Sequence, residues 1–245
     1  MREKLKWVAV AAFLSLIVLY ISVSLYRTSE IKPAAKVTVR IKDGESVLEI
    51  NKDLKSAGVF LNYELPSNVE GYLYPDTYEF FVPSGKEVVL QKFLDNFNSK
   101  AAPLFTGDYN LKDVLTVASL IEKEVPKNGD DREKVSGIIW KRLQGKMPLQ
   151  IDATVCYAKQ LRLDDYTGCY PLKPSDFADD SLYNTYRHTG LPPGPIGNPE
   201  SDAIYSALHP VSSSYWFFLS DPKTGKTIFA KTLDEQTRNI AKYLE

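Results

Sequence analysis

One acidic residue, Glu122, lies within the apolar stripe of a predicted helix over residues 111–125. At about 100° per residue, Glu122 falls between Leu111 and Leu115, whereas Glu124 points toward the polar side. Burial disfavours the charged form of a carboxyl and raises its pKa, which suits a general acid that works near neutral pH. The alternative is a buried glutamate that pairs with an Arg or Lys from elsewhere in the fold, or a position that is more exposed than the helical pattern suggests.

A second polar group follows Glu122 in the stretch 147–157, which we expect just past the end of a helix. Amides, carboxylates and hydroxyls hydrogen-bond the hydroxyls of sugars, and tyrosine rings stack on the apolar faces of sugar rings. These residue types predict a carbohydrate-binding segment formed by Gln150, Asp152, Thr154 and Tyr157. The same composition is also typical of ordinary loop caps.

A third group, residues 183–199, is rich in proline and glycine. These residues hold a backbone shape at low entropic cost. Loops of this kind either line a site or cross the surface, and composition alone does not separate the two.

The cysteines and histidines exclude some chemistry. The only histidines, His188 and His209, lack the spacing of a ligand pair, so no metal and no cofactor are predicted. Cys156 and Cys169 are 13 residues apart, and a disulfide between them would contribute about 3 kcal/mol through loop entropy. The alternative is two free buried thiols. Neither cysteine has the surroundings of a nucleophile.

The elements that must position these residues are mostly helices, which predicts an α+β fold. Capping boxes, proline stops and a Gly C-cap set their ends. We expect a strand at 37–41, helices at 46–58, 84–99 (opened by a capping box, Ser84 to Glu87), 111–125, 131–145 and 200–208 (capped by Asn198), a hairpin at 215–220 and 227–230, and a final helix from the capping box Thr232 to Glu235.

The N-terminal end predicts a membrane anchor. Residues 7–26 carry no charged side chain and follow a basic cluster of Arg2, Lys4 and Lys6. Such a segment, at about 1.5 Å per residue, covers the roughly 30 Å hydrocarbon core, whereas a cleaved signal peptide, the alternative, has a shorter apolar region. The basic cluster favours a cytoplasmic N-terminus and an extracytoplasmic remainder, which is a single-pass protein of the cell (inner) membrane.

Charge and length bound the exported part. Residues 1–27 carry four basic side chains and one acidic one, so without them the net charge changes from −1 to −4. This charge argues against nucleic-acid binding, which requires a basic face. We predict a cytoplasmic tail (1–6), a transmembrane helix (7–26), a tether (27–36), a small β-α unit (37–62) and a helix-rich catalytic domain (63–245).

Five motifs together resemble the MltG (YceG-like) endolytic murein transglycosylase family. They lie at 70–78, 118–124, 149–157, 183–186 and 190–199. The resemblance implies that Glu122, the first glutamate of Glu-Lys-Glu, is catalytic. It also implies substrate-binding roles for Tyr74, Asp76, Thr77, Tyr78, Asn184, Tyr186 and Pro193. The unit 37–62 corresponds to a reduced form of the family's LysM-like region.

The resemblance implies cleavage of the MurNAc-β-1,4-GlcNAc bond of nascent peptidoglycan, leaving 1,6-anhydroMurNAc ends, with Glu122 as acid and then base. The expected partners are glycan strands, the membrane and, from the family only, penicillin-binding synthases of the elongation machinery. One alternative is a muramidase that uses Glu122 and Asp152. Another is a non-catalytic cell-wall-binding scaffold that recruits partners through the aromatic segment 70–81.

Overall fold

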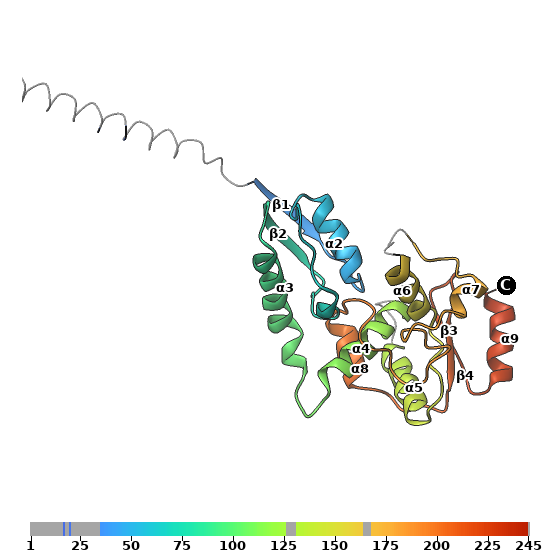
Figure 1. Cartoon of the computed structure of the whole chain (residues 1–245). Coiled ribbons are helices and arrows are strands. Elements are labelled where there is room, and N and C mark those ends of the chain that lie inside the picture. Colours follow the sequence, from blue (N-terminus) through green and yellow to red (C-terminus); the bar gives the residue numbers. More distant parts are fainter. Residues whose placement is uncertain (1–16, 18–19, 21–34, 126–130, 164–167, 245) are drawn as a thin grey trace, which may run out of the picture. The chain divides into compact units, whose positions relative to one another are not determined.

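Figure 1 shows a computed structural model of the chain, which describes residues 17, 20, 35–125, 131–163 and 168–244. The predicted cytoplasmic tail, membrane helix and tether fall outside the described residues, apart from residues 17, 20, 35 and 36. None of the helices in the described part has the length and apolarity that a bilayer crossing requires. Residues 37–245 form one compact unit, and it contains all the predicted site residues.

The N-terminal lobe of this unit combines two strands with two helices. They are β1 (Ala35–Arg40), α2 (Val47–Ser56), β2 (Thr77–Val82) and α3 (Lys86–Lys100), with the 3-10 turn η1 (Ser67–Val69) between α2 and β2. β1 pairs with β2, and the Ile41 amide donates to the Asp76 carbonyl at 2.8 Å, which links the end of β1 to the start of β2. Side chains of β2 alternate, so Tyr78 and Phe80 are buried.

One apolar core holds this lobe together. Ile50 and Leu54 of α2 pack in the same cluster as Phe80 of β2 and Phe93 of α3. The strand at 37–41 and the helix that begins after Ser46 are confirmed, and Ser46 and Glu49 form a capping box. The core continues beyond residue 62, the predicted end of the small unit, because β1 finds its hydrogen-bonding partner only at β2.

The second lobe is mostly helical. Its elements are η2 (Ala102–Leu104), α4 (Leu111–Glu124), α5 (Arg132–Gln144), α6 (Asp152–Leu163), α7 (Pro174–Phe177), α8 (Ser201–Leu208), β3 (Phe217–Ser220), β4 (Thr227–Ala230) and α9 (Leu233–Tyr243). α4 contacts α5, α6 and α8, and Figure 1 shows α8 lying along it. Helices and two small sheets confirm the α+β class.

Helix α4 forms the centre of the second core. Every residue from Val114 to Ile121 is buried, and the amide groups of Lys112 and Asp113 are capped by the Asn110 side chain. A helix that is buried nearly all round is fixed by its neighbours. Its last turn therefore holds side chains in set directions.

The C-terminal hairpin and the last helix are confirmed, whereas the predicted capping box is only half formed, because Glu235 Oε2 accepts from the Lys231 amide at 2.7 Å and not from the Thr232 amide. β3 and β4 pair antiparallel, with Phe217 opposite Ala230. The Thr232 side chain caps α9 by accepting from the Glu235 amide at 3.2 Å.

Two local predictions are wrong, and one helix was not predicted. No capping box opens α3, because Ser84 Oγ donates to the Phe81 carbonyl at 2.6 Å and Gly85 is the N-cap. Asn198 does not cap α8, because α8 begins at Ser201 and its N-cap is Glu200. The side-chain amide of Asn198 binds the N-terminal lobe instead. The stretch containing Asp152, Thr154 and Tyr157 is helical, since it belongs to α6.

Candidate active site

The last turn of α4 sends three consecutive side chains toward three different elements. Glu122 reaches α5, Lys123 reaches Glu49 of α2, and Glu124 interacts electrostatically with Asp152 of α6. Successive side chains on a helix diverge by about 100°. One helical turn can therefore serve a structural contact and a chemical site at once.

Glu122 is engaged in a buried polar network. Its side chain is only 4% exposed, and that of Arg132 only 5%. Arg132 Nη2 donates to Glu122 Oε1 at 2.7 Å, and the Glu200 amide donates to Glu122 Oε2 at 3.1 Å. Arg132 also donates to the Val125 carbonyl from Nε and Nη2. These bonds connect the end of α4 with the starts of α5 and α8.

The prediction that Glu122 faces the core is confirmed, and the alternative that sequence left open, a buried glutamate paired with an arginine, is the arrangement found. Both carboxyl oxygens of Glu122 accept hydrogen bonds from protein donors. Neither oxygen is therefore left without a protein partner. This environment suits a positioning role better than proton donation.

Glu124 has the opposite surroundings. Its side chain is partly exposed, yet protein atoms surround its carboxyl, and burial together with the nearby Asp152 carboxylate raises the pKa of Glu124 from 4.5 to about 7. A carboxyl with such a pKa is substantially protonated near neutral pH, which is the state that a general acid requires. Strongly shifted groups of this kind concentrate at functional sites.

Asp152 is the first residue of α6 and is exposed. The Tyr186 hydroxyl donates to Asp152 Oδ1 at 2.5 Å. Burial and this carboxylate raise the pKa of Tyr186 well above its usual range. The structure thus joins two predicted site residues, Asp152 and Tyr186, within electrostatic range of Glu124.

Buried threonines fasten the Tyr186 loop to the start of α6. Thr154 Oγ1 lies 2.9 Å from Thr185 Oγ1, and the Thr185 side chain accepts from the Ile151 amide at 3.0 Å. The Asn184 side chain donates to the Phe177 and Asp179 carbonyls. Thr154 and Asn184 are 0% exposed, so these two predicted substrate ligands position the site and do not face it.

Gln150 has a positive φ of 53°, which is uncommon for a residue other than glycine. The backbone amide of Gln150 donates to the Thr185 carbonyl at 3.2 Å, and the Gln150 side chain is exposed. Held strain of this kind is typical of functional loops. Gln150 therefore remains available for substrate two residues before Asp152.

The predicted residues Asp76, Thr77 and Tyr78 lie in the N-terminal lobe, whereas Tyr74 packs in the core around α4. None of the contacts among the described residues joins any of the four to Glu124. Asp76 accepts hydrogen bonds from Lys100 and Asn96. Both bonds lower the pKa of Asp76, and the bond from Lys100 has the larger effect. The Tyr74 hydroxyl contacts Ser201 Oγ at 2.7 Å. Asp76, Thr77 and Tyr78 line a separate pocket of about 480 Å³.

Pro193 and Tyr157 line another pocket, of about 470 Å³. Pro193 is exposed, whereas Tyr157 is 3% exposed and donates from its hydroxyl to Glu70 Oε2 at 2.9 Å. Tyr157 is therefore bound within the protein, and only Pro193 of this pair is free to contact a ligand over its surface.

Glu70 is a buried acid that residue patterns did not single out. Its oxygens accept from the Val47 amide at 3.1 and 3.0 Å and from Asn198 Nδ2 at 2.8 Å. Burial raises the pKa of Glu70 to about 7. The signal in the sequence was the motif 70–78, which begins with Glu70; the next residue, Gly71, has a φ of +90°, a conformation that favours glycine.

The predicted disulfide is present. Cys156 of α6 is bonded to Cys169, with their Cα atoms 5.3 Å apart. The bond attaches the segment from Gly168 to Tyr170 to the helix that begins with Asp152. Among the described residues, no group of three or more His, Cys, Asp or Glu side chains is arranged to hold a metal ion.

Known proteins resemble this chain over most of its length. A profile of the YceG-like family matches residues 22–242. A Bacillus subtilis protein named endolytic murein transglycosylase is 34% identical over 217 residues, which cover 85% of this chain and 58% of that protein. A Streptococcus pneumoniae protein of the same name is 32% identical over 180 residues, covering 72% of this chain and 32% of its own length.

The fold is also found in a solved structure. A crystal structure of a yceG-like protein from Listeria monocytogenes matches with a TM-score of 0.71 and 28% identity, over 87% of this chain and 78% of that one. This chain spans little more than half the length of the B. subtilis relative and about a third of the S. pneumoniae relative. The family match extends over nearly all of the described residues. The chain therefore belongs to the YceG-like family.

Proposed function

We propose that this chain is an endolytic lytic transglycosylase of peptidoglycan. It cleaves the MurNAc-β-1,4-GlcNAc bond within a glycan strand and leaves a 1,6-anhydroMurNAc end. Support comes from the names of the B. subtilis and S. pneumoniae relatives and from the group formed by Glu124, Asp152 and Tyr186.

The observation that carries this proposal is the raised pKa of Glu124, about 7, beside the Asp152 carboxylate. Protonated Glu124 donates its proton to the glycosidic oxygen, and the bond from that oxygen to C1 of the muramoyl ring breaks. The Glu124 carboxylate then accepts the proton of the muramoyl 6-hydroxyl, whose oxygen bonds to C1 and closes the anhydro ring. One carboxyl serves as acid and then base, and no water is consumed.

Glu124 thus replaces Glu122 as the proposed acid. Glu122 accepts from Arg132 and from the Glu200 amide, and it keeps the end of α4 in place. We assign Asp152 two functions: its charge helps to raise the pKa of Glu124, and with Tyr186 it presents hydrogen-bonding groups to the sugar.

The proposed setting follows from the apolar stretch at residues 7–26 and the basic residues before it. A single N-terminal span would keep the N-terminus in the cytoplasm and the catalytic unit outside, next to nascent glycan. Association with penicillin-binding synthases, and glycan binding by a LysM-like function of the N-terminal lobe, belong to this same proposal.

The test is product analysis. Purified sacculi are incubated with the full chain or with Glu124→Gln, and the released fragments are identified by mass spectrometry. We expect anhydromuramoyl ends from the parent chain and none above background from the variant. An active Glu124→Gln protein would refute the mechanism, and an inactive but folded parent chain would favour the scaffold alternative.

A second candidate, a muramidase, is favoured by one observation: Asp152 supplies a second carboxylate next to Glu124. Such a hydrolase would leave reducing ends that are heavier than anhydro ends by one water. The same mass spectra therefore decide between the two enzymes.

A further inference from the structure

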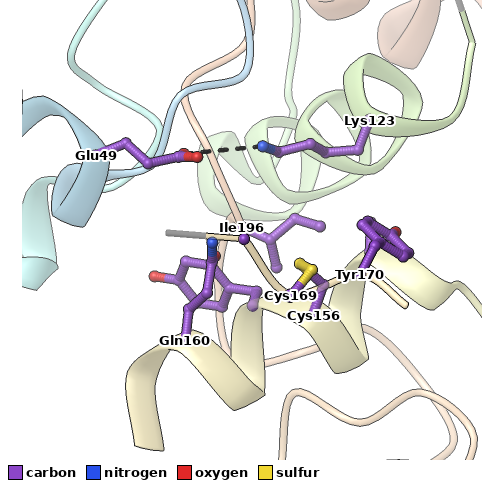
Figure 2. Close-up of a pocket in the computed structure, with 10 residues that line it drawn as sticks. Glu49, Lys123, Cys156, Gln160, Cys169, Tyr170 and Ile196 are labelled. Atoms are coloured by element: carbon purple, nitrogen blue, oxygen red, sulfur yellow. Dashed lines mark ion pairs between the residues drawn. A yellow bond between two sulfur atoms is a disulfide. The ribbon is translucent and has the colours of Figure 1, made fainter. Parts of the chain in front are cut away.

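A pocket of about 230 Å³ lies between helix α2 of the N-terminal lobe and helices α4 and α6 of the second lobe. Figure 2 shows Glu49 and Lys123 on one side of it and Gln160, Tyr170 and the Cys156–Cys169 disulfide on the other. We name it the Lys123 pocket. Complete small-molecule sites measure roughly 300–1,000 Å³, so this pocket fits one residue-sized group and not a glycan strand.

Two opposite charges face each other at this pocket without a close bond. Lys123 Nζ is 4.0 Å from Glu49 Oε2, and the two side chains are 32% and 30% exposed. Direct bonds between ammonium and carboxylate groups are about 2.7–2.9 Å long. The pair is therefore open and accessible.

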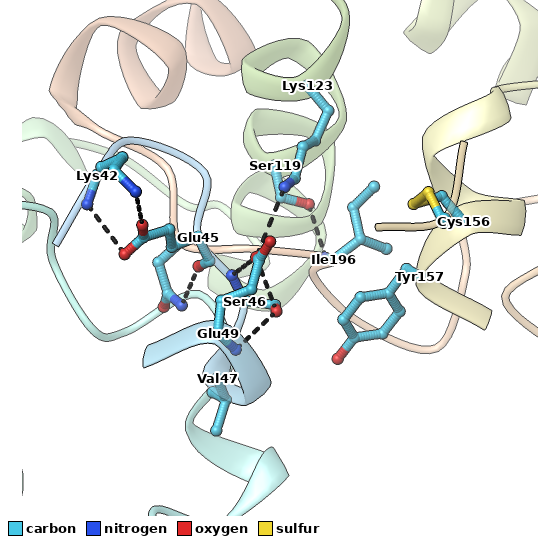
Figure 3. Close-up of polar contacts among 12 residues, drawn as sticks. Lys42, Glu45, Ser46, Val47, Glu49, Ser119, Lys123, Cys156, Tyr157 and Ile196 are labelled. Carbon is cyan, nitrogen blue, oxygen red and sulfur yellow. Dashed lines mark hydrogen bonds and ion pairs between the residues drawn. A yellow bond between two sulfur atoms is a disulfide. The ribbon is translucent and has the colours of Figure 1, made fainter. Parts of the chain in front are cut away.

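Both charged side chains are held by contacts other than the one between them. Glu49 Oε2 accepts from the Ser46 amide at 2.7 Å and from Ser46 Oγ at 2.9 Å, as Figure 3 shows. The Lys123 stem lies against the backbone of Gly44 and Gly197, where virtual Cβ atoms would come within 3.7 and 3.4 Å of it. A ligand that offers both charges would find its partners already in position.

The pocket adjoins the proposed catalytic group. Lys123 directly precedes Glu124, and Tyr170, which lines the pocket, interacts electrostatically with both Glu124 and Asp152. The disulfide holds Tyr170 next to α6. A substituent on a sugar bound at Glu124 would therefore reach Lys123 without leaving the protein surface.

We propose that the Lys123 pocket binds an amino-acid-sized group with an ammonium and a carboxylate, supplied by the peptide substituents of the glycan. Lys123 receives the carboxylate, Glu49 receives the ammonium, and the Gln160 amide offers further hydrogen bonds. The inference rests on the proposed function, since it names the part of the substrate that this enzyme reads besides the sugar chain.

Binding to the full-length Glu124→Gln protein tests it without turnover. Isothermal titration would compare soluble glycan strands that carry their peptides with the same strands after an amidase has removed them. We expect the peptide-bearing strands to bind about tenfold more tightly, a ratio that corresponds to one charged contact of about 1.4 kcal/mol. Adding Lys123→Met or Glu49→Gln should bring the ratio toward one.

The variants are matched to their surroundings. Methionine keeps the apolar stem of Lys123, and glutamine at position 49 keeps the capping-box geometry while removing the charge. Lys55 is an exposed lysine on the same helix as Glu49. As a control, Lys55→Met should leave the ratio of the two affinities unchanged. Strands whose peptide carboxylates are amidated should not bind more tightly than peptide-free strands when the pocket is unchanged. Lys123→Met should not weaken the binding of these amidated strands further.

A ratio near one in the Glu124→Gln background, or a ratio that survives both pocket substitutions, would overturn the inference. Failure of the proposed function is seen separately. In that case Glu124→Gln would still cleave the strands, or the parent chain would bind neither kind of strand.

Discussion

Two glutamates in the last turn of α4 illustrate how neighbouring positions receive different functions. Glu122 is 4% exposed and accepts from the buried Arg132, whereas Glu124 is partly exposed and lies beside another carboxylate, with a pKa of about 7. Glu122 is bonded to a cation and an amide, while burial and the like charge of Asp152 raise the pKa of Glu124. Burial alone therefore does not identify a general acid, because the protein donors around Glu122 already occupy both of its oxygens.

The largest expected effect comes from removing the ionisable group at each of the two positions. Glu124→Gln should lower the cleavage rate about 10²–10⁴-fold, the usual contribution of a general acid, without lowering the melting temperature. Glu122→Gln should lower the melting temperature and keep a measurable rate where it is folded. Rates on sacculi and circular dichroism melts measure both. Equal losses of activity in two folded variants would break the contrast.

The next effect concerns the cation of the buried network. Arg132→Met should destabilise the unit by about 3–5 kcal/mol, because it leaves the Glu122 carboxylate buried without its charged partner. Urea unfolding measures this loss. The double variant Arg132→Met with Glu122→Gln should recover part of it, whereas a cost under about 1 kcal/mol for Arg132→Met would mean that the pair is not buried as described.

A third prediction concerns Glu70, which, like Glu124, has a pKa that burial raises to about 7. Between pH 4.5 and 7 the unfolded chain loses the Glu70 proton and the folded chain keeps it, so stability should fall with rising pH by roughly 3 kcal/mol at most. Glu70→Gln should remove the Glu70 part of this slope, leave the part that comes from Glu124, and lower stability at pH 5, since its amide nitrogen would face N–H and O–H donors. Urea titrations at several pH values test this; an unchanged slope would contradict it.

The smallest effect sharpens the pairing of Glu124 with Asp152. Because the Asp152 charge raises the pKa of Glu124, Asp152→Asn should move the alkaline limb of the pH–rate profile toward lower pH and leave the maximal rate within about tenfold. Tyr186→Phe, which removes the hydroxyl bonded to Asp152, is the companion variant. A collapse of the rate in Asp152→Asn would instead favour the two-carboxylate muramidase.

Much of the fold could be predicted from the sequence where the signal was local. The apolar period of α4, the helix that begins after Ser46 and the terminal hairpin are properties of short segments, and the structure contains each of them. The capping box at Ser84 failed because a nearby carbonyl competes for the same hydroxyl.

The site was predicted less completely, because its decisive contacts join distant segments. The helical pattern identified Glu122 as the buried acid, yet Arg132 is what makes that acid a structural group. The stretch 149–157 does contribute Asp152 to the candidate site. However, Thr154 bonds to Thr185 and Tyr157 bonds to Glu70, so neither side chain faces the solvent. Which polar side chains are occupied internally depends on packing between elements, and a single sequence does not show this.

Asn198 makes the two lobes inseparable. Its fully buried amide accepts from the Gly71 and Leu73 amides and donates to the Glu45 carbonyl and to Glu70. A fragment that begins at residue 63 would retain Glu70 and Asn198 but lose the donors and acceptors of Glu45 and Val47. The N-terminal lobe is therefore a permanent part of the compact unit 37–245 and not an exchangeable accessory module, and shuffling it between homologues would require both surfaces to change together.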